Sequence, residues 1–191
     1  MNGDLNHAPI APVRIVLTGF MGAGKTTVGR LLANELAWAF VDLDDTIVAR
    51  EGRCIADIFA TLGEVAFREL EHHALHEAIQ KTHCVVALGG GAIELSANRE
   101  LLYSSPGTHV VFLEAPLEIL EVRCTEQQRK GAAIRPVFSE KSKLITRYTD
   151  RLPHYRMAHQ TVVTVDHDPA DVVRSILAGF DLSTKSSSHP S

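Results

Sequence analysis

The chain has 191 residues, 45% of them hydrophobic and 22% charged, and its formal net charge is -4. This length suits one α/β domain with a full hydrophobic core and is too short for two ordinary domains. No basic block indicates nucleic acid as a partner. No apolar run approaches the roughly 20 residues that cross a bilayer, and the first residues lack a signal-peptide layout, so we expect a cytoplasmic protein that does not enter the membrane.

The spacing of cysteines and histidines does not indicate a metal site. Cys54, Cys84 and Cys124 are widely separated and lack CxxC spacing, so we expect three reduced thiols. His72 and His76 stand four residues apart on one face of a predicted helix, a spacing that can chelate a metal. Because no motif marks Glu69 as a third ligand, we prefer a solvated helix face.

Short apolar runs alternate with longer segments of helical period, which predicts βαβ units on a parallel sheet. The expected fold class is therefore α/β, with three α/β/α layers around a five-stranded parallel sheet. The expected strands are Arg14–Thr18, Ala39–Asp42, Cys84–Leu88, His109–Leu113 and Thr161–Val165.

The first strand leads into GFMGAGKTT, Gly19 to Thr27, which fits the phosphate-loop pattern G-x-x-x-x-G-K-[ST]. Backbone N–H groups of such a loop point at phosphate oxygens, and the N-terminus of the following helix adds a favourable partial charge. Lys25 is expected to reach the β- and γ-phosphates, and Thr26 to offer its hydroxyl oxygen to Mg²⁺. The loop leaves open which molecule accepts the terminal phosphate.

The segment after the loop predicts a helix packed on the sheet. Its apolar residues recur at helical spacing and fall on one side: Val28, Leu31, Leu32 and Leu36. Later helices are expected at Leu144–Tyr155 and Ala170–Phe180.

The second strand ends in VDLDD. Carboxyl ends of strands line the ligand crevice of an open α/β sheet, so Asp42 and Asp44 should lie close to the phosphate loop. Alternation puts both on one side of a locally extended chain. Mg²⁺ beside a triphosphate needs a carboxylate, and an alcohol acceptor benefits from a second carboxylate that takes its proton. Capping of the next helix is the alternative, which we prefer for Asp45 and not for Asp44.

A helical stretch from Ile55 to Ile79 is interrupted at TLGE, where Gly63 suits a helix end and Glu64 a helix start. Arg68 and Glu71 stand three apart in its second part, near enough to pair. The apolar residues of that part face one way: Phe67, Leu70, Ala74 and Ala78.

Three glycines, Gly89, Gly90 and Gly91, follow the third strand in place of an acidic residue. Because they offer no side chain to pack, we expect close backbone approach to a ligand or to the phosphate loop. The carboxylate that binds metal must then come from elsewhere, and Asp42 is the obvious source.

Thr125 to Lys141 has much charge, little periodicity and both Gly131 and Pro136, so we expect a mobile surface loop. Residues 1–12 and 181–191 are expected to be disordered tails. A single domain would then span residues 13–180.

Six stretches together resemble the shikimate kinase family: GFMGAGKTT, DLDD, IADIFATLGEVAFRELE, LGGGA, the RP of the mobile loop and RLPHY. They cover about Val13 to Phe180 in the expected order, and general nucleotide kinases share only the first. The resemblance implies a P-loop kinase architecture with a mobile lid at about 125–141. It also implies a monomer that, with Mg²⁺, transfers the γ-phosphate of ATP to the 3-hydroxyl of shikimate, a step of aromatic amino-acid biosynthesis.

The resemblance implies roles for single residues. Thr26 and Asp42 would hold Mg²⁺, while Asp44 would bind the acceptor hydroxyl and act as its base. Arg68 and Arg151 would bind the shikimate carboxylate, which suits the two parallel hydrogen bonds that a guanidinium can donate. The other implied shikimate ligands are Glu71, Gly89, Gly90 and Gly91. The implied catalytic residues are Lys25, Asp44 and the lid arginine Arg135, and the implied nucleotide ligands are Gly22, Ala23, Gly24, Lys25, Thr26, Thr27, Arg123 and Arg135.

Three points stay open beside the resemblance. The loop TEQQRKGAAIRP is longer than expected for this family, so Arg123, Arg129 and Arg135 all remain candidates for contact with ATP, with Arg123 the best fit near adenine. VDHDPAD fits the adenine-side loop, but no residue in it can be matched. A gluconate kinase or a regulatory module without catalysis are the alternatives; DLDD, FRELE and GGG argue against the first, and the presence of Lys25, Asp44 and Arg135 against the second.

Overall fold

The structure, a computed structural model, describes residues 12–129 and 141–180. Five parallel strands form one sheet in the order β2-β3-β1-β4-β5. All residues of β1 and β3 are buried, as expected for strands covered on both faces, which explains why they read as apolar runs. The strands are β1 (Arg14–Thr18), β2 (Ala39–Asp42), β3 (Cys84–Ala87), β4 (Thr108–Glu114) and β5 (Gln160–Val163). The predicted five-stranded parallel sheet is confirmed.

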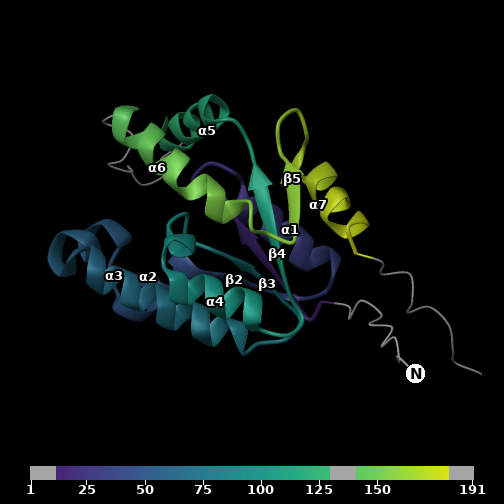
Figure 1. Cartoon of the computed structure of the whole chain (residues 1–191), viewed down its shortest axis with the longest axis horizontal. Helices are drawn as coiled ribbons and strands as arrows, with labels where there is room; N and C mark the ends of the chain where they lie inside the picture. The colour runs from purple at the N-terminus through teal and green to yellow at the C-terminus, as the bar shows by residue number, and fades with distance from the viewer. Residues whose placement is uncertain (1–11, 130–140, 181–191) are drawn as a thin grey trace, which may run out of the picture.

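Helices cover both faces of the sheet (Figure 1). α1 (Lys25–Glu35) and α7 (Pro169–Ala178) lie together on one face, and α4 (Ser96–Ser104) lies against β4 on the other, beside α3 (Ile55–Ile79). α2 (Leu43–Glu51) packs on α3, and the short helix η1 (Ala92–Glu94) contacts α4 and α6. α5 (Leu117–Arg129) and α6 (Lys141–Tyr155) lie beyond the carboxyl ends of the strands (Figure 1). These three layers confirm the predicted α/β class. No helix in the described ranges is long and apolar enough to cross a membrane.

The apolar side of α1 differs from the prediction at one residue. Val28 and Leu32 are buried, but Leu31 is 42% exposed. The buried side is centred near Gly29 and Leu32, because the ring of Phe40 packs where a Cβ on Gly29 would lie, 2.5 Å from a ring carbon. With about 3.6 residues per turn, Leu31 falls near the opposite edge of the helix, so the prediction for Leu31 is wrong.

Gly63 interrupts α3 as predicted, with φ of 80° and ψ of 174°. The second part of the helix carries Phe67, Ala74 and Ala78 into the core, with Leu70 partly buried. The predicted apolar face is therefore confirmed.

The predicted central loop has wrong bounds. α5 continues to Arg129, and α6 begins at Lys141. The segment from Thr125 to Arg129 lacks an apolar period but continues α5. The hydroxyl of Thr125 donates to the carbonyl oxygen of Glu121 at 2.9 Å, the bond that a threonine can make to the residue four before it within a helix. Residues 130–140, which include Arg135, lie outside the described ranges, as do the two predicted tails except for Pro12.

The three cysteines are free thiols, as predicted. Cys54 is exposed, while Cys84 and Cys124 are buried.

Candidate active site

The phosphate loop joins β1 to α1, and its glycines adopt backbone angles that other residues rarely reach. φ is 143° at Gly19, 81° at Gly22 and 90° at Gly24. Gly22 also lets α5 approach the loop, because an added Cβ would lie 2.8 Å from the sulfur of Cys124. The Nζ of Lys25 donates to the carbonyl oxygen of Gly19 at 2.7 Å, so the lysine lies along the loop.

A cavity of about 320 Å³ opens on one side of this loop. The guanidinium of Arg123 is fixed in its wall, because it donates to the hydroxyl of Thr164 at 2.9 Å and to its carbonyl oxygen at 2.7 Å. His167 and Pro169 lie in the same wall. Both belong to the segment VDHDPAD, in which the sequence alone identifies no residue of the adenine-side loop. The loop contributes Gly22, Ala23, Gly24 and Thr27 to this cavity.

A smaller cavity of about 80 Å³ lies at the other side of the loop, where β2 and β3 end. Lys25, Thr26, Asp42, Asp44 and Gly90 are among its lining residues. The hydroxyl of Thr26 donates to Oδ2 of Asp42 at 2.7 Å. The structure thus brings together the two residues predicted to hold Mg²⁺, from α1 and the end of β2, and their oxygen atoms are the kind of ligand that Mg²⁺ prefers.

Asp42, and not Asp45, caps α2. The Oδ1 of Asp42 accepts from the backbone N–H groups of Asp44, at 3.0 Å, and Asp45, at 3.5 Å. The capping prediction for Asp45 is therefore wrong: its side chain is exposed and pairs with Arg30 at 3.4 Å. The chain is also not extended as far as Asp44, since the helix begins at Leu43. Asp44 still faces the cavity, from the first turn of the helix.

Arg68 and Glu71 form the predicted pair on α3, with 2.7 Å between Nη1 and Oε2. Glu71 is only 1% exposed. Burial raises the pKa of the Glu71 carboxyl and the nearby Asp44 adds to this effect, while Arg68 opposes it. Oε1 of Glu71 has no hydrogen-bond partner within the described part of the chain.

The three glycines of the run after β3 have different neighbours: Gly89 and Gly91 lie against polar side chains, and the atom nearest to Gly90 belongs to the backbone of the phosphate loop. A Cβ on Gly89 would lie 2.5 Å from Oε1 of Glu71 and 2.9 Å from Oδ1 of Asp44, and a Cβ on Gly91 would lie 2.6 Å from Nη1 of Arg68. At Gly90 the nearest atoms would be 3.6 Å away or more, among them the backbone nitrogen of Met21 in the phosphate loop. Gly90 thus lies at ordinary contact distance from the phosphate loop, while at Gly89 and Gly91 the missing Cβ makes room for side chains.

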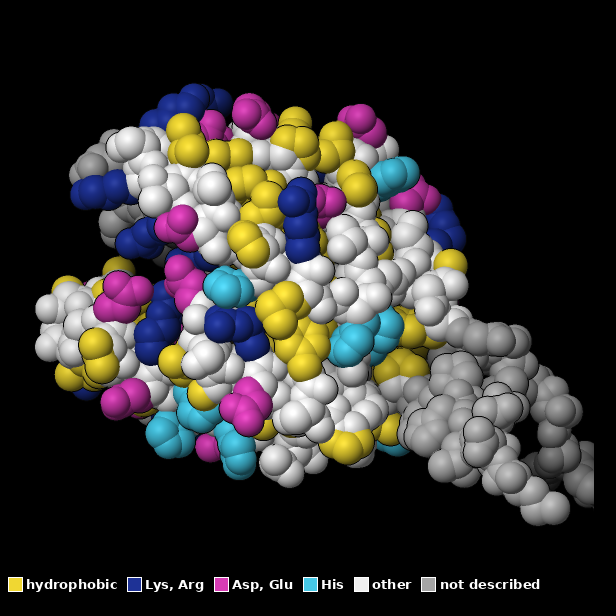
Figure 2. Space-filling model, in the orientation of Figure 1, with side chains coloured by type: hydrophobic (Ala, Val, Ile, Leu, Met, Phe, Trp, Pro, Cys, Tyr) yellow, Lys and Arg dark blue, Asp and Glu magenta, His cyan; other side chains and the backbone are white. Residues whose placement is uncertain are grey.

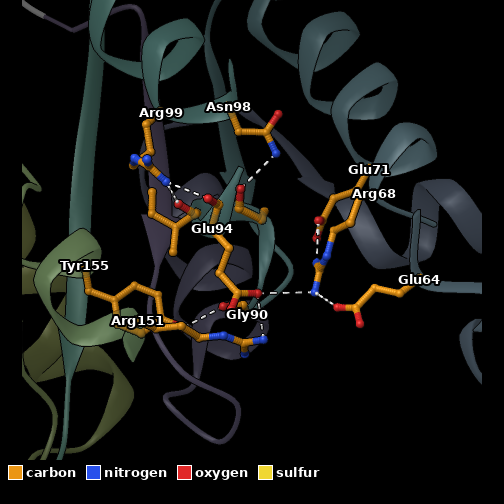
Figure 3. Close-up of polar contacts among 11 residues, drawn as sticks. Glu64, Arg68, Glu71, Gly90, Glu94, Asn98, Arg99, Arg151 and Tyr155 are labelled. Atoms are coloured by element: carbon orange, nitrogen blue, oxygen red, sulfur yellow. Dashed lines mark hydrogen bonds and ion pairs between the residues drawn. The ribbon is translucent and has the colours of Figure 1, made fainter. Parts of the chain in front are cut away.

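Arg151 comes from α6 and is 4% exposed. Its guanidinium lies over the ring of Phe20, 5.7 Å from the ring centroid, and its Nη2 is 2.9 Å from Oε2 of Glu94 in η1. Arg68 approaches the same oxygen, at 3.4 Å (Figure 3). The structure therefore brings Arg68 and Arg151 to one carboxylate. On the face shown in Figure 2, side chains of both charges gather around a hollow between α6 and α3.

Two residues of this group were absent from the predicted site. Glu94 carries no recognisable pattern, although it is an acidic residue three positions after the glycine run. Tyr155 is fully buried, and its hydroxyl donates to the carbonyl oxygen of Gly90 at 2.5 Å. The sequence feature that points to Tyr155 is its place in the stretch RLPHY, four residues after Arg151.

The histidine face of α3 is only partly solvated. His76 is exposed, but the Nδ1 of His72 lies 2.6 Å from Oδ1 of Asn98, so the prediction of a solvated side chain is wrong for His72. Among the described residues, no group of three or more His, Cys, Asp or Glu side chains is arranged to hold a metal.

The fold and the site define a P-loop kinase, with a nucleotide loop after β1 and acidic and basic side chains gathered across from it. A model of the family described as Shikimate kinase matches residues 21–180. The chain belongs to the shikimate kinase family.

Individual relatives agree with this assignment. The shikimate kinase of Enterococcus faecalis is 40% identical over 166 residues, which cover 85% of this chain and 95% of the relative. That of Psychrobacter cryohalolentis is 37% identical over 180 residues, covering 92% and 95%. A solved structure described as shikimate kinase from Acinetobacter baumannii in complex with shikimate has 38% identity and a TM-score of 0.79, and covers 87% of this chain and 91% of that chain.

Proposed function

We propose that this chain transfers the γ-phosphate of ATP to the 3-hydroxyl of shikimate, giving 3-phosphoshikimate and ADP. The observation that carries the assignment of the acceptor is the approach of Arg68 and Arg151 to one carboxylate oxygen, at 3.4 and 2.9 Å. Two guanidinium groups in this arrangement suit a small substrate with a carboxylate. Membership of the shikimate kinase family, and a relative solved in complex with shikimate, support the same acceptor.

ATP binds with its phosphates in the loop from Gly22 to Thr27. Backbone N–H groups there and the N-terminus of α1 attract phosphate oxygens, and Lys25 supplies a positive charge to them. The larger cavity takes the adenosine part, with Arg123, His167 and Pro169 at its wall. This placement is supported by the position of that cavity directly beside the phosphate loop.

Mg²⁺ fits beside the phosphates at Thr26 and Asp42. The fit is supported by the two oxygen atoms that would bind the metal, the hydroxyl oxygen of Thr26 and Oδ2 of Asp42, which lie 2.7 Å apart. When bound, Mg²⁺ neutralises negative charge on the phosphates. Asp42 keeps its Oδ1 on the backbone of α2, so the side chain is oriented before any metal binds.

Asp44 acts as the general base of the transfer. As the new O–P bond forms, the carboxylate of Asp44 takes the proton of the shikimate 3-hydroxyl and ADP leaves with the electrons of the broken bond. The role is supported by the position of Asp44 in the smaller cavity, with Lys25 and Gly90. Arg135, outside the described residues, stays a prediction as the lid arginine that stabilises the transferring phosphate and helps to exclude water.

The chain functions as a cytoplasmic monomer with a single domain over residues 13–180. The single domain is supported by the one five-stranded sheet, whose strand ends and helices carry the described site residues. Light scattering on a sizing column tests the monomeric state, and a stable dimer would contradict it.

An assay that couples ADP release to a detectable reaction tests the activity itself. Shikimate, gluconate, a nucleoside monophosphate and water are compared as acceptors at saturating MgATP. We expect shikimate to stimulate ADP release well above the water background. Equal rates with and without shikimate would contradict the proposal, and stimulation by gluconate alone would favour the gluconate kinase alternative.

A further inference from the structure

Glu94 lies between the two arginines that we assign to the substrate carboxylate (Figure 3). Its Oε2 is 2.9 Å from Nη2 of Arg151 and 3.4 Å from Nη2 of Arg68. The three side chains come from separate elements, η1, α6 and α3. A carboxylate of the protein thus already makes the two contacts that the carboxylate of shikimate requires.

The backbone around Glu94 is held firmly. Asn98, fully buried, donates its Nδ2 to the carbonyl oxygen of Ala92 at 2.8 Å. Arg99 donates its Nη1 to the carbonyl oxygens of Ile93, at 2.8 Å, and Glu94, at 2.7 Å. Side chains of α4 therefore fix η1 independently of what the carboxylate of Glu94 contacts.

The side chain of Glu94 is much less constrained. It is 38% exposed, while those of Arg68 and Arg151 are 18% and 5% exposed. The carboxylate is held by its ion pairs with the two arginines, and a rotation about the side-chain bonds of Glu94 can carry it into solvent without moving η1. Rotations of exposed side chains are fast compared with enzyme turnover.

The charges of the cluster disfavour a second carboxylate beside Glu94. Arg68 and Arg151 are balanced by Glu71 and Glu94, and Arg68 has a further partner in Glu64 at 3.2 Å. Asp44 adds negative charge near Glu71. An anionic ligand that entered while Glu94 stayed in place would meet like charge at short range in a partly buried site.

We propose that Glu94 is an internal carboxylate that occupies the binding position of the substrate carboxylate between Arg68 and Arg151 and is displaced when shikimate binds. The inference rests on the proposed function. Glu94 keeps the two guanidinium groups paired and oriented when the site has no substrate, and it lowers the apparent affinity for shikimate, because the substrate must replace contacts that the protein already makes.

The test is Glu94→Gln, which keeps the size of the side chain and removes its charge. We expect the shikimate KM and the Kd measured by titration calorimetry to fall about three- to tenfold, because a neutral amide competes poorly for two guanidinium groups. The kcat and the KM for ATP should stay within about twofold, since Glu94 takes no part in the transfer. Glu94→Ala should also lower the shikimate KM. Because alanine has no amide, a fall in both variants would come from loss of the charge and not from a new contact made by glutamine.

Glu64→Gln is the matched control, because Glu64 also pairs with Arg68 but is 58% exposed and does not contact Arg151. We expect its shikimate KM to match that of the wild type.

The outcomes are distinct for the two proposals. A wild-type enzyme without shikimate-dependent ADP release contradicts the proposed function. A wild-type enzyme that is active, with an unchanged or raised shikimate KM in both Glu94 variants, overturns the displacement and makes Glu94 a structural partner of the arginines.

Discussion

The hydroxyl of Tyr155 donates a 2.5 Å hydrogen bond to the carbonyl oxygen of Gly90 and so joins the end of α6 to the glycine run after β3. Tyr155 is fully buried, and burial raises the pKa of its phenol, so it stays a donor at any ordinary pH. The bond fixes the backbone of Gly90 where it lines the smaller cavity.

Tyr155→Phe should weaken both the fold and the acceptor site. The Gly90 carbonyl loses its buried donor, which costs about 1–3 kcal/mol of unfolding free energy. We expect the shikimate KM to rise about three- to tenfold, a loss typical of one positioning hydrogen bond, with the KM for ATP little changed. Urea denaturation and steady-state kinetics measure the two effects.

Tyr148→Phe is the control on the same helix. The hydroxyl of Tyr148 donates to the carbonyl oxygen of Ala115 at 3.2 Å, away from the glycine run. This variant should lose stability without a change in shikimate KM. An equal rise in KM in both variants would show that general loosening of α6, and not the Gly90 bond, is responsible.

Gly89→Ala should disturb the two carboxylates behind the glycine run. The new Cβ would lie 2.5 Å from Oε1 of Glu71 and 2.9 Å from Oδ1 of Asp44. We expect a cost of about 1–3 kcal/mol from overpacking and a loss of kcat/KM of at least about tenfold, because Asp44 is moved. Gly90→Ala has no protein atom within 3.6 Å of its Cβ, so its stability should stay close to that of the wild type. Similar melting curves for both variants would contradict the packing argument.

Asp44→Asn tests the general base. The amide keeps the shape of the side chain but cannot take a proton, so kcat should fall about 10²- to 10⁴-fold, while the Kd for ATP changes less than about twofold. Asp45→Asn is the neighbouring control, because Asp45 is exposed and pairs only at the surface with Arg30, a kind of contact worth at most about 1 kcal/mol. Turnover of Asp44→Asn equal to that of Asp45→Asn would remove the assigned role.

The parts of the fold that the sequence predicts well are those set by local physics. Strands such as Cys84–Ala87 are buried on both faces and therefore leave unbroken apolar runs. The phosphate loop is recognised because its glycines, Lys25 and Thr26 stand at the fixed spacing of the pattern G-x-x-x-x-G-K-[ST]. Gly63 is recognised as a helix interruption because few other residues tolerate its backbone angles.

Predictions fail where neighbouring residues compete for one role. VDLDD offers three aspartates as caps, and Asp42 takes the position because its own backbone is still extended, at φ of -98° and ψ of 123°, while its side chain reaches two and three residues ahead. The sequence pattern predicts neither α4 nor α5. Ser96–Ser104 is a helix of nine residues, too short to show a clear period.

The contacts of Glu94 depend on the whole fold. Arg68 and Arg151 lie 26 and 57 residues away in the chain, and only the folding of α3 and α6 around η1 brings them together. The resemblance to the shikimate kinase family predicts a substrate-binding role for the two arginines, because they stand in motifs that it shares with that family. The residue between them has no motif, so its position had to come from the structure.

His109 gives the fold a predictable dependence on pH. Its ring lies 4.5 Å from that of Phe180 and 5.2 Å from that of His159, and its Nε2 is buried without a hydrogen-bond partner in the described residues. Burial, and to a smaller extent His159, lowers the pKa of His109, while Gln160 opposes this. The folded state therefore binds fewer protons than the unfolded state between the lowered pKa and the ordinary value near 6.5. The stability contributed by the neutral ring is fully present above the ordinary value and is lost as the pH falls through the lowered one.

His109→Phe should remove part of this loss. Between about pH 7.5 and pH 5, we expect the unfolding free energy of the wild type to fall more than that of the variant. The difference between the two falls should be less than about 1 kcal/mol, because a half-buried ring is screened by solvent. Urea titrations at each pH give the comparison. His76→Gln, at an exposed position on α3, should follow the wild-type curve. Parallel curves for wild type and His109→Phe would mean that His109 binds protons equally in both states, and the acid sensitivity would then have to come from other groups.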